Sequence, residues 1–163
     1  MNLPWTICFI RHADRVLMQY RRKQPNRNCW NGVGGHIEPG ETPLQCIIRE
    51  VAEETGIHLT TVRFAGLVAG FAGDRGMYAF VADLPNDLDP STPESLDHPD
   101  GWLAWIPLQY LADEPEIVSN IPRFLPPMLA GEEPVQYHCI YDGFGDLVEV
   151  QQCPLTISLE GVA

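Results

Sequence analysis

Residues 34–57 constrain the fold of this chain more than any other segment, because they join a glycine-rich loop to one capped, acidic helix. Thr42 is suited to the N-cap, Pro43 to the first helical position, and Gln45 completes a capping box with Thr42. Gly56 fits the C-terminal stop of the helix. The sequence therefore predicts a helix that begins at Pro43 and ends just before Gly56.

The two faces of this predicted helix differ in chemistry. One face is apolar at helical spacing, so we expect it to pack on a core; its residues are Leu44, Ile47, Ile48, Val51, Ala52 and Thr55. The other face carries Arg49 and three crowded carboxylates, those of Glu50, Glu53 and Glu54. Mg2+ prefers oxygen ligands and would neutralise their mutual repulsion. The alternative is a solvated acidic face on which Arg49 pairs with Glu53.

The spacing of these residues follows a longer pattern, G-x5-E-x7-R-E-U-x-E-E-x-G-U, in which U is a bulky aliphatic residue. The chain matches this pattern at every specified position, namely Gly35, Glu41, Arg49, Glu50, Val51, Glu53, Glu54, Gly56 and Ile57. This is the Nudix box, here residues 35–57, and the chain therefore resembles the Nudix hydrolases. The resemblance implies an α/β protein with the Nudix fold, which is an α/β/α sandwich around a mixed central sheet.

The resemblance also implies a role for most of the box residues. Glu53 and Glu54 would bind a Mg2+ ion, for which Mn2+ can substitute, and Glu50 and the backbone carbonyl of Gly35 would join them. Glu50 is the general base in some relatives, and the sequence does not separate that task from metal binding. Arg49 would orient Glu53, so the predicted catalytic residues are Arg49, Glu50 and Glu53.

Some Nudix enzymes take one more carboxylate from a loop outside the box. Residues 85–101 are rich in Pro, Asp, Ser and Glu, and this composition predicts a loop or lid. Asp100 is the candidate metal ligand in this segment, with Glu94 and Asp97 in reserve. The alternative is that Asp100 only makes the loop soluble. Within the box, Glu41 would support the site without binding the metal.

Residues 16–23 and 30–35 resemble the MutT-like branch, and more closely its oxidised-purine nucleoside triphosphatases. In such relatives the residue that matches Asn31 contacts the base, and those that match Thr6 and Arg21 lie in the same pocket. Lys23, in the basic segment before the glycine loop, and Gly34, in that loop, complete the predicted substrate-binding residues on this side of the box.

The segment that reads the purine in those relatives differs here. They have a tryptophan and paired aspartates, whereas this chain has Val118, Ser119 and Asn120. An asparagine amide can donate to and accept from a purine edge, so Asn120 is the predicted substitute. The alternative is that Asn120 caps the helix that follows it.

Charge limits the classes of partner. The net charge is -12, with 10 Lys and Arg against 22 Asp and Glu, and this balance disfavours binding to polymeric DNA or RNA. A nucleoside triphosphate bound with its metal is compatible with this charge, because four of the ten basic residues cluster at Arg21, Arg22, Lys23 and Arg27. The alternative is that this cluster is a solvated strand end and loop.

Two further features suggest the compartment. No basic segment precedes an apolar run at the amino terminus, and no apolar stretch reaches membrane-spanning length, so we expect a cytoplasmic protein without a membrane partner. The five cysteines are scattered and form no C-x-x-C pair, which indicates reduced thiols. A monomer and a homodimer are both compatible with the sequence.

The rest of the chain predicts one domain over residues 1–163. A short extended segment is expected over 32–37, and a short or kinked helix over 117–129, where three prolines interrupt the apolar spacing. The last residues, about ten, are expected to fray or be disordered. Apolar, partly alternating runs predict strands at 3–10, 15–21, 62–71, 77–84, 102–107, 135–141 and 146–150.

Our leading hypothesis is a Mg2+-dependent pyrophosphohydrolase that converts oxidised purine nucleoside triphosphates such as 8-oxo-dGTP to the monophosphate and pyrophosphate, so that the nucleotide pool is sanitised. One alternative is hydrolysis of another nucleoside diphosphate derivative, such as ADP-ribose or a dinucleoside polyphosphate. Another is a catalytically silent domain that senses a nucleotide, although such domains tend to lose the box carboxylates that are all present here.

Overall fold

One mixed sheet runs through the part of the chain that the computed structural model describes, which is residues 1–24, 26–71, 74–89, 97–98, 101–158, 160 and 162. Its strands and the helices between them follow the chain in this order: β1 (Asn2–His12), β2 (Arg15–Arg21), β3 (Trp30–Asn31), α1 (Pro43–Thr55), β4 (Arg63–Phe71), β5 (Arg75–Asp83), β6 (Asp97–His98), β7 (Gly101–Pro107), the 3-10 helix η1 (Leu108–Tyr110), α2 (Ile121–Leu129), β8 (Val135–Tyr141) and β9 (Leu147–Cys153).

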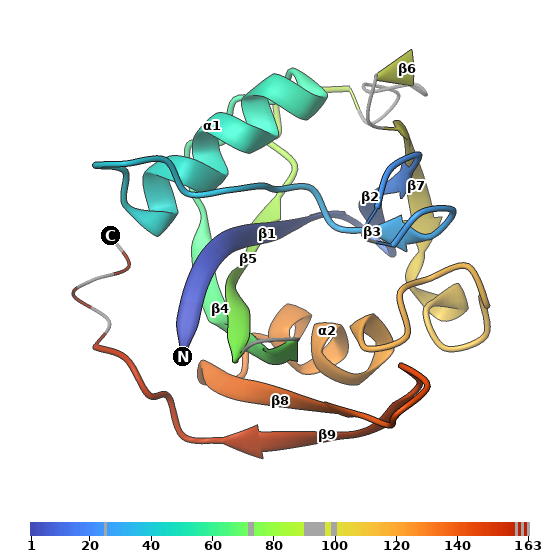
Figure 1. Ribbon diagram of the computed structural model, residues 1–163. Helices are drawn as coiled ribbons and strands as arrows, with labels where there is room; N and C mark the ends of the chain where they lie inside the picture. Colours follow the sequence, from blue (N-terminus) through green and yellow to red (C-terminus); the bar gives the residue numbers. More distant parts are fainter. Residues whose placement is uncertain are drawn as a thin grey trace.

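The order of the strands across the sheet is β6-β7-β2-β1-β5-β4-β8-β9, and β3 pairs with β2. β1 runs parallel to β5 and β4 runs parallel to β8, whereas the other pairs are antiparallel. Figure 1 shows α1 on one side of the central strands and α2 on the other, with the β8–β9 hairpin beyond α2. The predicted α/β/α sandwich with a mixed sheet is therefore confirmed.

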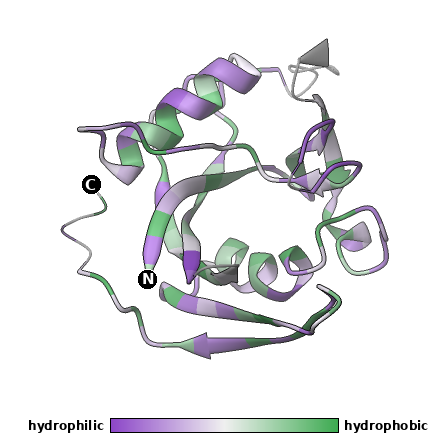
Figure 2. Cartoon of the chain, in the orientation of Figure 1, coloured by the Kyte–Doolittle hydropathy of each residue, from purple (hydrophilic) through white to green (hydrophobic). Residues whose placement is uncertain are grey.

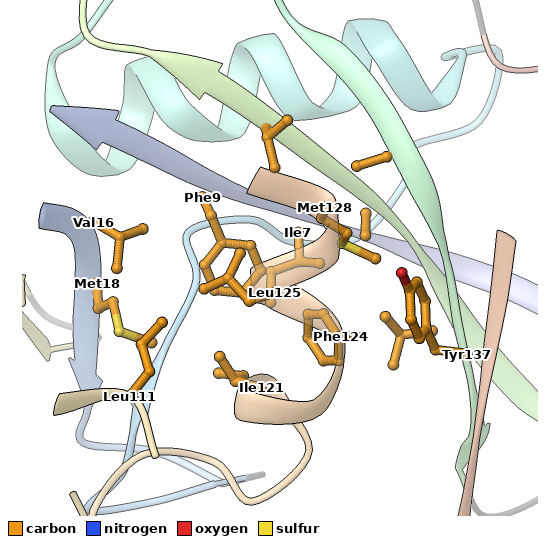
Figure 3. Close-up of a cluster of buried hydrophobic side chains, with 14 of the residues drawn as sticks. Ile7, Phe9, Val16, Met18, Leu111, Ile121, Phe124, Leu125, Met128 and Tyr137 are labelled. Atoms are coloured by element: carbon orange, nitrogen blue, oxygen red, sulfur yellow. The ribbon is translucent and has the colours of Figure 1, made fainter. Parts of the chain in front are cut away.

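Alternate residues of the central strands fill two separate cores, because successive side chains of a strand point to opposite faces. On β1, Ile7 and Phe9 belong to the core against α2, whereas Cys8 and Ile10 belong to the core against α1. Figure 3 shows the α2-side core, where the ring of Phe9 meets Phe124 at 5.9 Å between centroids. Burial on both faces fixes the register of β1, since a slip of one residue would exchange the two sets.

Most of the predicted elements are present, with shifts at their ends. β9 continues to Cys153, three residues past the predicted end, and β6 lies inside the segment that was predicted to be a loop. α2 begins at Ile121 and contains Pro126 and Pro127, so it is short, as the prolines predicted.

The apolar stripe of α1 is rotated from its predicted position. Ile48 is 37% exposed, so the prediction that it packs on the core is wrong. Cys46, which was left out of the stripe, is fully buried instead. Figure 2 shows hydrophilic and hydrophobic bands alternating along α1, as expected for a helix with one covered face.

The end of the chain returns to the amino-terminal end of α1. The Leu44 amide donates to the Val162 carbonyl at 3.1 Å, and the Thr156 hydroxyl donates to the Gln136 side chain at 3.0 Å. Val162 is buried in the α1-side core, so these contacts hold part of the segment that was expected to fray. Within the described residues, neither helix has the length and apolar character needed to cross a membrane.

Candidate functional site

The acidic helix α1 begins and ends where local sequence predicts. The Thr42 hydroxyl accepts from the Gln45 amide at 3.2 Å, and the Gln45 side chain accepts from the Thr42 amide at 2.9 Å, so the capping box is complete. At the other end Gly56 has a φ of 74°, and its amide donates to the Ala52 carbonyl at 3.0 Å. These contacts fix where α1 begins and where it ends.

Arg49 is the centre of the charge network on this helix. Its Nε and Nη2 donate to the two oxygens of Glu41 at 2.8 and 3.0 Å, which is a bidentate pair. Its Nη1 donates to Glu50 at 2.9 Å and to Glu53 at 3.2 Å. The hydrogen bonds from Arg49 lower the pKa of Glu41 to about 2. Arg49 thus ties the loop before α1 to two of the predicted metal ligands.

The three crowded carboxylates have three different environments. The Glu53 side chain is 59% exposed, whereas that of Glu50 is 15% exposed. Glu50 packs directly on Gly35, where an added Cβ would collide with its carboxylate. Glu54 is partly buried, and its Oε2 accepts from the Gly34 amide at 3.2 Å. The sequence predicted one uniform acidic face, but only Glu53 is well exposed on it.

Burial raises the pKa of Glu54 to about 7, and the charge of Glu50 adds to this rise. The Gly34 amide and Arg21 lower the pKa by smaller amounts. A carboxylate that is costly to ionise beside a second carboxylate is a place where a divalent cation would be strongly stabilising. The chemistry of the donors therefore fits a hard divalent cation.

The carboxylates are not preassembled around one point. Among the described residues, no three His, Cys, Asp or Glu side chains converge as the ligands of a metal would. Arg49 accounts for this in part, since it draws Glu50 and Glu53 into ion pairs. The Gly35 carbonyl accepts from the Thr6 amide at 2.9 Å and retains a second lone pair. Asp100 and Glu94 lie outside the described residues, as does the side chain of Asp97.

Four of the predicted substrate residues lie on the α1 side of the sheet, near the box. Thr6 is buried, and its hydroxyl is 3.2 Å from the Cys46 thiol of α1. Arg21 comes close enough to Glu54 to affect its pKa, and Gly34 donates to the same carboxylate. Asn31 lies opposite Gln19 in the β2–β3 pair and so shares its face of the sheet. Lys23, the fifth, is exposed just beyond β2.

Asn120 lies apart from this group. It is buried at the start of α2, and its Nδ2 donates to the Tyr141 hydroxyl at 3.1 Å and to the Cys139 sulfur at 3.6 Å. Asn120 occupies the N-cap position of α2, as the alternative has it, but its side chain makes no capping hydrogen bond. The Asn120 amide is therefore engaged with Tyr141, whereas Asn31 shares the α1-side face of the sheet with Gln19.

A row of aromatic residues on the α2 side of the sheet, the face opposite to that of Gln19 and Asn31, was not predicted from the sequence. Trp102 of β7, Tyr20 of β2 and Trp30 of β3 are neighbours across the three strands. Tyr20 stacks on Trp102 at 4.4 Å between centroids, Trp30 meets Tyr20 edge-on at 5.0 Å, and the Arg22 guanidinium lies 5.4 Å from the Trp102 ring centroid. Only the strand register shows that these residues adjoin.

A second unpredicted residue is Gln19 of β2, which is 1% exposed. Its Nε2 has no hydrogen-bond partner within the described residues.

A cleft of about 990 Å³ lies away from the box, between the carboxyl ends of β1 and β5 and the end of α2, and none of the predicted site residues line it.

Comparisons with known proteins agree with this fold and box. A family model described as NUDIX domain matches residues 2–126. The NAD-capped RNA hydrolase NudC of Vibrio parahaemolyticus (serotype O3:K6) is 33% identical over 95 residues, which cover 58% of this chain and 36% of NudC. The chain thus matches well under half the length of this relative.

Two solved structures share the fold. The MutT protein from Bacillus halodurans superposes with a TM-score of 0.72 at 21% identity, and the match covers 91% of this chain and 95% of that one. The bifunctional NMN adenylyltransferase/ADP ribose pyrophosphatase from Francisella tularensis, complexed with AMP and a Mn ion, gives a TM-score of 0.64 at 23% identity, covering 80% of this chain and 42% of the other. At these identities the likeness concerns the fold alone.

Proposed function

Because the chain belongs to the NUDIX domain family, we propose that it hydrolyses the pyrophosphate linkage of a nucleoside diphosphate derivative with a bound Mg2+ ion, for which Mn2+ can substitute. The observation that carries this proposal is the complete box: Arg49 is bonded to Glu41, Glu50 and Glu53, and Glu54 is held beside Gly34. Gly35, Glu50, Glu53 and Glu54 would hold the ion. A divalent cation at these oxygens supplies the charge that neutralises the phosphate.

The protein side chains have separate tasks in this scheme. Glu50, which packs on Gly35, accepts the proton of the attacking water as the water oxygen bonds to phosphorus and a bridging P–O bond breaks. Arg49 keeps Glu53 in place by its hydrogen bond at 3.2 Å. Arg21, near Glu54, adds positive charge for the substrate phosphates. Asp100 remains the proposed additional ligand from outside the box.

For the substrate we propose first an oxidised purine nucleoside triphosphate such as 8-oxo-dGTP, which would yield the monophosphate and pyrophosphate. The support is the position of Thr6, Arg21, Asn31 and Gly34 on one side of the sheet with the box. Asn31 and Lys23 would bind the base and phosphates. Asn120 supports this choice less, because its amide donates to Tyr141.

A second candidate substrate is a dinucleotide with an internal pyrophosphate, such as NAD. The curated relatives named NAD-capped RNA hydrolase favour it, and so does the row of Trp102, Tyr20 and Trp30, since aromatic rings can stack on a nucleobase. The two candidates share the same bond chemistry and differ in what lies beyond the diphosphate.

Product analysis separates the candidates. Purified protein with Mg2+ is incubated with 8-oxo-dGTP, dGTP, NAD and ADP-ribose at equal concentration, and the products are resolved by chromatography. Pyrophosphate released faster from 8-oxo-dGTP than from dGTP supports the first candidate, and nicotinamide mononucleotide with AMP from NAD supports the second. Absence of turnover on all four, with Mg2+ or Mn2+, would contradict the proposed activity. Glu53→Gln is the control for contaminating enzymes.

A further inference from the structure

The Gln19 amide nitrogen is a buried hydrogen-bond donor that the described residues do not satisfy. Gln19 lies in the middle of β2 and is 1% exposed, so bulk water does not reach it. Buried polar side-chain atoms are nearly always hydrogen-bonded, and an exception calls for an explanation. The nitrogen of this amide can only donate, so it requires an acceptor.

The side chain has little freedom to find that acceptor elsewhere. β2 is flanked by β3 and β7 at this level, so Gln19 lies between Asn31 and Leu103 on the face that α1 covers. Towards β7, its Cγ is so close to Gly101 that an added Cβ there would lie 3.3 Å away. The Asn31 oxygen already accepts from the Gly32 amide at 3.0 Å. Among the described residues, neither neighbouring strand supplies a hydrogen-bond partner for the Gln19 nitrogen.

The Glu54 carboxylate is an acceptor of the right chemistry near Gln19. Gln19 lowers the pKa of that carboxylate as a neighbouring hydrogen-bond donor does, although its nitrogen has no hydrogen bond of full geometry within the described residues. The Oε2 of Glu54 accepts from the Gly34 amide at 3.2 Å, and each carboxylate oxygen has more than one lone pair, so the carboxylate retains acceptor capacity for the Gln19 amide.

We propose that Gln19 is a positioning residue, whose Nε2 donates to the Glu54 carboxylate when Glu54 binds a divalent cation and so fixes the orientation of that ligand. This inference rests on the proposed function, because it takes Glu54 as a metal ligand. Residues that hydrogen-bond a metal-binding side chain contribute substantially to metal affinity, since a side chain that is already oriented loses less freedom when it binds the metal. Gln19 acts through Glu54 and does not touch the substrate.

The test is the affinity of the full chain for Mn2+ alone, measured by titration calorimetry without nucleotide. Gln19→Met removes the donor and keeps nearly the same length and volume. We expect Mn2+ to bind about 10-fold more weakly to this variant than to the wild type. The melting temperature without metal should fall little, because the amide nitrogen that is lost had no partner within the described residues. Gln19→Leu should behave in the same way.

Gln136→Met is the matched control. Gln136 is also a buried glutamine on a strand, but its amide oxygen accepts from Thr156 and it lies on β8, away from the box. This variant should keep the Mn2+ affinity of the wild type and lose thermal stability, which is the opposite pattern.

The outcomes separate this inference from the proposed function. Wild-type Mn2+ affinity in both Gln19 variants, or a large loss of metal-free stability in both, would overturn the positioning role and leave the hydrolase proposal intact. A wild-type protein that binds no Mn2+ and hydrolyses no nucleotide would overturn the proposed function, and the role of Gln19 with it. A weaker affinity with unchanged metal-free stability supports the inference.

Discussion

Arg49 and Glu41 form a bidentate pair, with Nε to Oε1 at 2.8 Å and Nη2 to Oε2 at 3.0 Å. The two residues are eight positions apart, so the pair fastens the loop before α1 to the middle of that helix. A third nitrogen of the same guanidinium remains to bond Glu50 and Glu53. Glu41 therefore determines the orientation in which Arg49 presents itself to the proposed metal ligands.

Glu41→Gln should destabilise the protein by about 1–2 kcal/mol at pH 7, because a charged acceptor is lost from a bidentate pair. The pKa of Glu41 is about 2 in the folded protein against an ordinary value of 4.5. A lowered carboxylate pKa stabilises the fold above the ordinary value, and the stabilisation is lost as the pH falls towards the folded value.

Urea unfolding of the wild type and Glu41→Gln at several pH values checks this prediction. The difference in free energy of unfolding should be full at pH 6–7, decline below about pH 4.5 and vanish near pH 2. A carboxylate without an arginine partner would not serve the same purpose. Asp142→Asn, for example, would not test an ion pair, because the Asp142 carboxylate accepts only from amides of its own turn among the described residues. A difference that does not depend on pH would show that the charge of Glu41 is not what stabilises the pair.

Glu54→Gln should raise the stability of the metal-free protein at pH 8 by roughly 2 kcal/mol while it abolishes most of the activity. The folded pKa of Glu54 is raised to about 7, so the penalty of its charge is absent below about pH 4.5, grows as the pH rises and is complete above 7. Thermal melts at pH 5 and pH 8 without metal would measure this gain, which should be small at pH 5.

Glu53→Gln is the matched variant for this prediction. Its carboxylate is 59% exposed, so its loss should change the metal-free stability little at either pH. Turnover should still fall by orders of magnitude, since Glu53 is a proposed metal ligand. Wild-type turnover in both glutamine variants would contradict the metal assignment, and equal stability effects would contradict the different burial of the two groups.

Gly35→Ala should inactivate the protein through Glu50. An added Cβ would collide with the Glu50 carboxylate, so Glu50 must move away from the loop or the loop must shift. We expect a destabilisation of about 1–3 kcal/mol and a turnover reduced at least 10-fold. Gly143→Ala is the control, because a Cβ added at Gly143 would have no heavy atom of the described residues within 4 Å. Full activity of Gly35→Ala would show that this packing is dispensable.

Asn120→Ala should affect the stability of the protein, whereas Asn31→Ala should affect its choice of nucleotide. Asn120→Ala removes a buried donor from Tyr141, so we expect a loss of about 1–2 kcal/mol in stability with an unchanged KM. Asn31→Ala should leave the stability nearly unchanged and reduce the discrimination between 8-oxo-dGTP and dGTP. Urea unfolding and steady-state kinetics on both variants test this. A raised KM in Asn120→Ala would indicate that Asn120 binds the substrate. Equal losses of turnover on all nucleotides in Asn31→Ala would argue against a role of Asn31 in recognising the base.

Local sequence determined the acidic helix and the strands around it. The cap of α1 depends on Thr42 and Gln45, which are three positions apart, and its end depends on Gly56 alone, so both can be identified without the rest of the fold. The alternation on β1 likewise follows from the period of a strand. The box spacing then identified the family.

Tertiary structure decided which side chains the box can use. The rotation of α1 that buries Cys46 and exposes Ile48 depends on how the helix meets the sheet, and the same rotation buries Glu54 more than Glu53. The register of β2 with β3 and β7 decides which side chains lie together. It brings Gln19 beside Asn31 and near Glu54. The same register forms the row of Trp102, Tyr20 and Trp30. Such register is set by contacts between segments far apart in the chain, so helix caps and strand periods, which act over a few residues, do not specify it.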